Sequence, residues 1–205
     1  MQGVARPVIL LFAKAPVAGK VKTRLSPPLG EEQAVRVHKA LVAGMWTRLG
    51  ELREADRELH TDGETDAWPD AVPRKLQSGG DLGARIFAAL DEALAKGRPK
   101  AMIVGSDTAG LPPRLLRDLL ESRSDVALGP AYDGGYYAIC CRKVKAAMFD
   151  EVRWSTGHTL TDTVRGALRC GLTVHVGEPW FDIDTADDLK RLPPELQREI
   201  GWERQ

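Results

Sequence analysis

The first strongly apolar stretch of the chain runs directly into a loop rich in positive charge. Residues Val8–Phe12 form a continuous apolar run, which is typical of a buried strand. Pro16 and Gly19 prevent the next residues from continuing as strand or helix. A cation-rich loop at the carboxyl end of a strand is suited to hold a polyanion such as a nucleotide phosphate chain. We therefore expect nucleotide contacts from this loop, at Lys14, Gly19, Lys22, Thr23 and Arg24.

The positive charge of this basic loop is not balanced locally. Four cations lie within residues 14–24, and no Asp or Glu precedes Glu31. The alternative is a solvated basic loop without function, since lysines are mostly exposed. Two sharper nucleotide motifs are absent, because Val21 stands where a Walker A loop needs Ser or Thr, and no Gly-x-Gly-x-x-Gly occurs. The loop thus indicates phosphate binding without either motif.

Length and composition restrict the class of protein. With 205 residues, 43% of them apolar, the chain is long enough for one α/β domain with a substantial core. Its zero net charge argues against bulk electrostatic binding to nucleic acid or membrane. The N-terminal apolar run is too short for a signal peptide core or a membrane helix, so we expect a cytoplasmic protein. The sequence leaves the oligomeric state open.

An acidic residue follows the clearest buried strand. Residues Ala101–Gly105 form that strand, and a helix begins at Pro112–Pro113. Asp107 lies between them, just past a strand's carboxyl end, where an open α/β sheet presents its ligands. The alternative is an Asx-turn residue that closes a loop. The apolar character of the strand favours a functional carboxylate.

Two more acids occur near the end of the chain. In an extended segment alternate side chains share a face, so Asp182 and Asp184 are expected to point together. They precede a helix that Thr185 is expected to cap, and the helix dipole does not explain them. Two carboxylates on one face repel unless a cation lies between them or one is protonated. Asp182 and Asp184 therefore predict a site for a hard divalent cation, Mg²⁺ or Mn²⁺.

Two glycine-containing stretches supply further candidates. Gln77 and the pair Gly79 and Gly80 precede a helix expected over residues 82–96. The glycines would let the backbone approach a flat base whose edge Gln77 could read, although capping of the helix explains this stretch equally well. The second stretch, Asp133-Gly-Gly-Tyr136, has a hairpin turn as its alternative. If functional, Asp133 is expected to position the acceptor or act as a base.

The remaining pattern alternates strands with helices. Apolar stripes at helical spacing predict helices over 31–49 and 159–169, with a short helix from 185 to 192. Further strands are expected over 57–60, 125–129, 136–141 and 172–176. Such alternation is typical of an α/β sheet covered by helices.

Six motifs occur in order along the chain: Lys14-Ala-Pro…Gly19-Lys-Val-Lys-Thr-Arg24, Gly79-Gly-Asp-Leu-Gly83, Gly105-Ser-Asp-Thr-Ala-Gly-Leu-Pro112, Gly129-Pro…Asp133-Gly-Gly-Tyr-Tyr137, Trp154-Ser-Thr156 and Asp182-Ile-Asp-Thr-Ala-Asp-Asp-Leu189. Together they resemble one family, the GT-A-like transferases that include the arsenosugar-biosynthesis type of glycosyltransferase. The likeness spans nearly the whole chain, and more distantly it extends to phospholactate guanylyltransferase, the molybdopterin nucleotidyltransferases and the ketodeoxyoctonate cytidylyltransferase.

This resemblance implies a fold and a division of labour. The fold would be a single GT-A three-layer α/β sandwich over residues 1–205 with a mixed, mostly parallel sheet. Nucleotide would bind in the half about 1–110 and the acceptor in the half about 111–205, where Tyr136, Trp154 and Ser155 are expected to contact it. The resemblance also implies that Asp107 and Asp184 carry the metal. Two departures are that Ala13 and Ala15 replace glycines of many nucleotidyltransferase loops, and that Gly105 takes the first position of the glycosyltransferase Asp-x-Asp.

Two reactions are compatible with these residues, and Lys22, Asp107 and Asp133 are the expected catalytic side chains in both. A glycosyltransferase would move a sugar from a nucleotide sugar to a small-molecule acceptor and release a nucleoside diphosphate. A nucleotidyltransferase would move the nucleotidyl group of a nucleoside triphosphate and release pyrophosphate. The closer resemblance favours glycosyl transfer, whereas the single acid after the apolar strand favours nucleotidyl transfer. A nucleotide-binding module without turnover is a third alternative.

Overall fold

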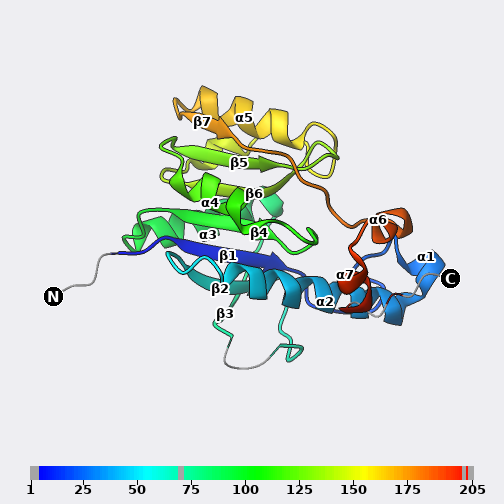
Figure 1. Cartoon of the computed structure of the whole chain (residues 1–205). Coiled ribbons are helices and arrows are strands. Elements are labelled where there is room, and N and C mark those ends of the chain that lie inside the picture. The colour runs from blue at the N-terminus through cyan, green and yellow to red at the C-terminus, as the bar shows by residue number, and fades with distance from the viewer. Residues whose placement is uncertain (1–4, 69–71, 200–201, 203–205) are drawn as a thin grey trace.

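The structure is a computed structural model that describes residues 5–68, 72–199 and 202 (Figure 1). Its centre is a seven-stranded sheet in the order β3-β2-β1-β4-β6-β5-β7. Strand β6 runs antiparallel to both neighbours, and all other pairs are parallel. The expected mixed, mostly parallel sheet is therefore confirmed. The strands are β1 Val8–Ala13, β2 Asp56–Thr61, β3 Arg74–Leu76, β4 Ala101–Gly105, β5 Val126–Pro130, β6 Tyr136–Cys141 and β7 Val174–Val176.

Helices cover both faces of this sheet (Figure 1). Because side chains alternate along a strand, Ile9 and Leu11 of β1 pack on one face, while Val8 and Leu10 pack on the other. Helices α2 (Glu31–Leu49) and α4 (Pro113–Glu121) bury their apolar stripes on the first face. Helices α3 (Leu82–Ala95) and α5 (Thr159–Arg169) do so on the second. The result is the expected three-layer sandwich.

A smaller apolar cluster fastens the C-terminal segment to the start of the chain. Ile183 and Leu189 pack against Leu25, Val37 and Leu41, and all five side chains are buried. Short helices surround this cluster: α1 (Ser26–Leu29), α6 (Ala186–Lys190) and α7 (Pro194–Glu199). The cluster thereby holds residues 181–184 beside the basic loop, although the two segments are far apart in sequence.

Most of the expected elements are present with shifts of one or two residues at their ends. Asp81 caps α3 by accepting a hydrogen bond from the Ala84 amide. Thr185 caps α6, as expected, and it does so in a capping box with Asp188. The sequence pattern did not indicate α1, β3, α7 or the 3-10 turn η1 (Ala146–Met148), which are short and carry no clear apolar period. Among the described residues, no helix combines the length and apolar character needed to cross a membrane.

The topology brings the candidate residues to one edge of the sheet. Strands β1, β4 and β5 are parallel, so Lys14, Asp107 and Asp133 all follow carboxyl ends at the same edge. Strand β6 is antiparallel and begins there, which brings Tyr136 to that edge as well. Open α/β sheets bind ligands at this edge.

One glycine sets how closely α5 approaches the rest of the molecule. A Cβ atom at Gly166 would lie 2.1 Å from the carbonyl oxygen of Met148 in η1, a contact with backbone that cannot rotate away. We expect Gly166→Ala to lower the free energy of unfolding by about 1–3 kcal/mol, because overpacking forces the backbone to shift. Urea denaturation measures this change. Leu168→Ala, two residues later and exposed, serves as control; equal stability of the two variants would contradict the close contact.

Candidate functional site

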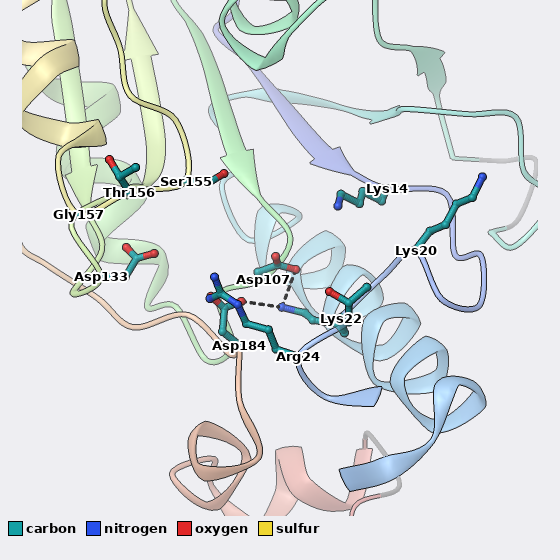
Figure 2. Close-up of a pocket in the computed structure, with 11 residues that line it drawn as sticks. Lys14, Lys20, Lys22, Arg24, Asp107, Asp133, Ser155, Thr156, Gly157 and Asp184 are labelled. Carbon is teal, nitrogen blue, oxygen red and sulfur yellow. Dashed lines mark hydrogen bonds and ion pairs between the residues drawn. The ribbon is translucent and has the colours of Figure 1, made fainter. Parts of the chain in front are cut away.

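A cavity of about 460 Å³ opens at this edge of the sheet (Figure 2). It lies among the basic loop, the loop after β4, the C-terminal segment and two facing loops. We call it the phosphate cavity, and its lining residues are Lys14, Lys20, Lys22, Thr23, Arg24, Asp107, Asp133, Ser155, Thr156, Gly157 and Asp184. Figure 2 shows Asp133 and residues 155–157 on one side, and the basic loop on the other.

The ammonium group of Lys22 lies between the two predicted metal ligands. Its Nζ is 2.9 Å from Asp107 Oδ1 and 3.7 Å from Asp184 Oδ1, and it donates to the Ile183 carbonyl oxygen. Only 3% of the Lys22 side chain is exposed, compared with 48% for Asp107 and 35% for Asp184. The two acids thus converge on one ammonium group, which stands between them.

The backbone of the basic loop is held in an unusual conformation. Lys22 has φ 46°, and among the described non-glycine residues only Ser155, across the cavity, shares a positive φ. Such conformations cost about 1–3 kcal/mol each and persist where the surrounding contacts fix them. Two contacts anchor the start of the loop: Asp62 Oδ1 accepts from the Ala15 amide at 2.7 Å, and His38 Nε2 lies 2.9 Å from the Lys14 carbonyl oxygen.

The electrostatics of the cavity favour an anionic ligand. Burial alone would raise the pKa of Asp107, but the charge and hydrogen bond of Lys22 outweigh it and hold that pKa below its ordinary value. Asp107 therefore stays ionised. Arg24 lies 3.3 Å from Asp184, so Lys22 and Arg24 largely balance these acids. Lys14 and Lys20 have no carboxylate partner in the described part of the chain, which leaves their charge for a ligand.

The carboxylates of this site suit a hard divalent cation only with additional oxygen ligands. Within residues 5–68, 72–199 and 202, no group of three or more His, Cys, Asp or Glu side chains is arranged to hold a metal. Mg²⁺ commonly takes one or two carboxylates and completes its coordination with substrate phosphates and water. Asp107 and Asp184 therefore fit a metal that binds together with a phosphate chain.

Asp182 lies apart from these two acids. Its Oδ1 accepts a hydrogen bond from the Thr108 hydroxyl at 2.9 Å. Burial raises its pKa to about 6, which the hydrogen bond of Thr108 partly offsets and the charges of Asp107 and Asp133 reinforce. It lines a neighbouring apolar cavity rather than the phosphate cavity. The structure thus separates Asp182 from Asp184.

The facing wall is built from two loops that meet through glycines. Gly134 has φ 88°, and a Cβ there would lie 2.3 Å from the Gly157 carbonyl oxygen. Asp133 Oδ1 accepts from the Gly135 amide at 2.8 Å, so the turn bond that was the alternative explanation is present. The same side chain also lines the phosphate cavity. Asp133 therefore has a structural contact and faces the site.

A second cavity, of about 440 Å³, continues from the phosphate cavity toward α3, and Gln77 lines it. The Gln77 amide donates to the His60 carbonyl oxygen at 3.0 Å, and its Oε1 accepts from Arg85 at 3.2 Å. Both ends of the amide thus already have protein partners, while Arg85 faces the cavity. Gly79 and Gly80 are not among its lining residues, and Gly19 lines neither cavity.

The three predicted acceptor residues line a third cavity, of about 250 Å³, although Ser155 also borders the other two. Several lining residues were missed from sequence. Lys20, Thr156 and Gly157 adjoin chosen residues, and Asp62 directly follows β2, which was a usable signal. His38 lies on the buried side of α2 among apolar residues, and nothing in the sequence sets it apart from them. Arg85 lies one helical turn past the cap of α3.

Comparisons with known proteins agree with this fold. Residues 47–156 match the family described as "Uncharacterized protein conserved in bacteria (DUF2064)". A solved structure from Desulfovibrio desulfuricans G20, provisionally described as a nucleotide-diphospho-sugar transferase, is 34% identical with TM-score 0.82, covering 89% of this chain and 84% of that one. No curated protein matches the sequence.

Two more distant structures share only the fold. The inositol-1-phosphate CTP transferase from T. maritima is 17% identical with TM-score 0.59, and each chain is covered completely. CMP:2-keto-3-deoxy-manno-octonic acid synthetase, solved with CTP, is 11% identical with TM-score 0.59, covering 95% of this chain and all of that one. The expected fold class is confirmed: the chain has the nucleotide-diphospho-sugar transferase fold, and it belongs to the DUF2064 family.

Proposed function

We propose that this protein is a transferase that uses a nucleotide-activated donor, and most specifically a glycosyltransferase that acts from a nucleotide sugar on a small-molecule acceptor. The observation that carries this proposal is the phosphate cavity, in which two unpaired lysines face two converging carboxylates. The 34% identical relative, described as a sugar transferase, supports the choice of donor. So does the resemblance of the motifs to the arsenosugar-biosynthesis type.

Each part of the cavity receives a role in this proposal. Lys14, Lys22 and Arg24 neutralise the diphosphate, and Arg85 borders the space proposed for the base. Asp107 and Asp184 would hold Mg²⁺ or Mn²⁺, which supplies further charge stabilisation to the phosphates when bound. Before a metal binds, Lys22 holds the two carboxylates together through its ion pairs.

The proposed reaction uses the facing wall for the acceptor. The acceptor oxygen forms a bond to the sugar carbon, and the bond from that carbon to the diphosphate oxygen breaks. The electron pair leaves with the nucleoside diphosphate, whose charge the cations stabilise. Asp133 faces the cavity from the acceptor side and would take the proton of the attacking hydroxyl.

Nucleotidyl transfer is the second candidate, because one observation favours it. Asp107 is the single acid of the loop after β4, and Gly105 stands where many glycosyltransferases place another. A site of this kind would release pyrophosphate from a nucleoside triphosphate.

A donor screen separates these candidates. The protein is incubated with nucleotide sugars or nucleoside triphosphates and a mixture of small hydroxyl compounds, with and without Mg²⁺ or Mn²⁺, and products are followed by ³¹P NMR. We expect a nucleotide sugar to yield nucleoside diphosphate only when the metal is present. Asp184→Asn should be inactive both with and without metal. Asp187→Asn on α6, outside the cavity, is the control. Pyrophosphate release would support the second candidate, and binding without turnover would contradict both.

The unpaired charge of the cavity predicts how it binds a phosphate chain. Replacing Lys14 and Lys20, both exposed, by Ala should weaken binding of inorganic pyrophosphate at least about tenfold, since each lost charge-assisted hydrogen bond is worth roughly 1.5–3 kcal/mol. Titration calorimetry measures the affinity. The double variant Arg36→Ala and Lys39→Ala on α2 removes the same charge outside the cavity and should bind normally; equal weakening there would refute a local site.

The turn bond of Asp133 allows a clean test of its role. Asparagine keeps the Oδ1 acceptor for the Gly135 amide, so Asp133→Asn should preserve the turn and remove only the negative charge. We expect at least about a hundredfold lower kcat with the active donor, within the range of general-base catalysis, and unchanged affinity for pyrophosphate. Full activity in this variant would show that Asp133 is only a turn residue.

A further inference from the structure

The third cavity differs in character from the phosphate cavity that it adjoins. Its volume is about 250 Å³, and it lies between the sheet and helices α3 and α5. The walls are mainly apolar or aromatic side chains, with Asp133 and Asp182 as the acids and three hydroxyl residues at the border. The apolar and aromatic members are Phe12, Leu82, Ile86, Ile103, Tyr136, Tyr137, Ile139 and Trp154. We call it the apolar cavity.

Its charges are all of one sign. Of the described residues that line it, none is Lys or Arg, whereas four cations line the phosphate cavity. Asp133 and Asp182 would repel a phosphate or carboxylate placed inside. An anion there would also lose hydration without gaining a partner, which is costly in an apolar environment.

The apolar cavity is open to the proposed site of reaction. It shares Asp133, Ser155 and Thr156 with the phosphate cavity. It also shares Phe12, Leu82, Gly105, Trp154 and Ser155 with the second cavity. A molecule in the apolar cavity would therefore border directly on a nucleotide whose phosphates lie beside Lys14 and Lys22.

Size and wall chemistry limit the occupant. An engineered apolar cavity of roughly 150 Å³ takes up benzene in another protein, so about 250 Å³ accommodates one substituted six-membered ring. The rings of Tyr136 and Trp154 lie edge to face, with centroids 6.4 Å apart, so two aromatic side chains line the cavity at a steep angle to each other. The Tyr136 hydroxyl is fully buried beside the Thr163 side chain of α5, so Tyr136 offers its ring rather than its polar end to the cavity.

We propose that the apolar cavity binds the acceptor and that this acceptor is an uncharged hydroxyl compound with a single apolar or aromatic ring, not a sugar phosphate or a carboxylate. The hydroxyl lies at the border with the phosphate cavity, beside Asp133, and the ring lies against Ile86 and Tyr136. This assignment rests on the proposed function and names its acceptor class. It also favours glycosyl transfer, because the attacking group need not carry a phosphate.

Two fluorinated probes of matched size test this proposal. Binding of 4-fluorobenzyl alcohol and of 4-fluorobenzoate is followed by ¹⁹F NMR, with inorganic pyrophosphate present to occupy the cations of the phosphate cavity. We expect the alcohol to bind and the carboxylate to bind at least about tenfold more weakly, a difference of about 1.4 kcal/mol. Comparable or tighter binding of the carboxylate would overturn the uncharged class.

A pair of variants on α3 locates the bound probe. Ile86 is buried and lines the apolar cavity but neither of the other two cavities described above. Ile86→Phe therefore fills the space and should weaken binding of the alcohol at least about tenfold by removing its apolar contacts. Leu94→Phe adds the same group to the same helix away from the cavity and should leave binding unchanged. If both variants keep the melting temperature of the parent protein and bind the alcohol with equal affinity, the alcohol does not occupy the apolar cavity.

Titration with pyrophosphate alone separates this inference from the proposed function. If pyrophosphate binds but the alcohol does not, the acceptor assignment is wrong and the nucleotide site stands. If pyrophosphate itself does not bind, the proposed function fails first.

Discussion

The ammonium group of Lys22 joins three parts of the chain that share no local sequence. It contacts the carboxylates of Asp107 and Asp184 and the backbone carbonyl of Ile183, while the Ile183 amide donates to the Asp107 carbonyl oxygen. A nearly buried ammonium must find oxygen partners, and here they come from the loop after β4 and from the C-terminal segment. The position of the basic loop, and with it the charge of the cavity, depends on this contact.

Local contacts fix the shape of each wall of the cavity. Lys22 and Ser155 adopt positive φ on opposite walls, and close packing of Gly134 on Gly157 holds the 131–135 turn against residues 154–157 within the facing wall. Groups held in place before a ligand arrives need less ordering when it binds, which favours affinity and rate.

The sequence predicted those features that depend on local order along the chain. Apolar runs such as Ala101–Gly105 marked strands to within a residue or two, and the polar residues that follow them lie at one edge because the strands are parallel. The hairpin turn at residues 133–136 indicates that β6 pairs with β5, but the pairing of β6 with β4 has no local signature, nor does the three-residue strand β3. Long helices were predicted well because their apolar stripes repeat over several turns.

Features that depend on distant contacts could not be predicted in this way. Sequence reasoning chose Asp107 and Asp184 together, but Lys22 stands between them only because the cluster of Leu25, Ile183 and Leu189 closes that end of the molecule. The engagement of Gln77 with His60 and Arg85 likewise requires the fold. The hydrogen bond from Thr108 holds Asp182 away from Asp184. The alternation of side chains in an extended segment, which placed the two acids on one face, takes no account of such a contact.

The contact between Lys22 and Ile183 spans 161 positions of the chain, and this has a consequence for protein synthesis. The ribosome releases the basic loop together with β1, but Ile183, which accepts from Lys22, emerges 161 residues later. Strands β1, β2 and β4 can pair before then, whereas the cavity cannot assume its final charge distribution. A nascent chain therefore carries the basic loop without the carboxylate of Asp184, which pairs with Lys22 and Arg24, until residue 184 has left the exit tunnel.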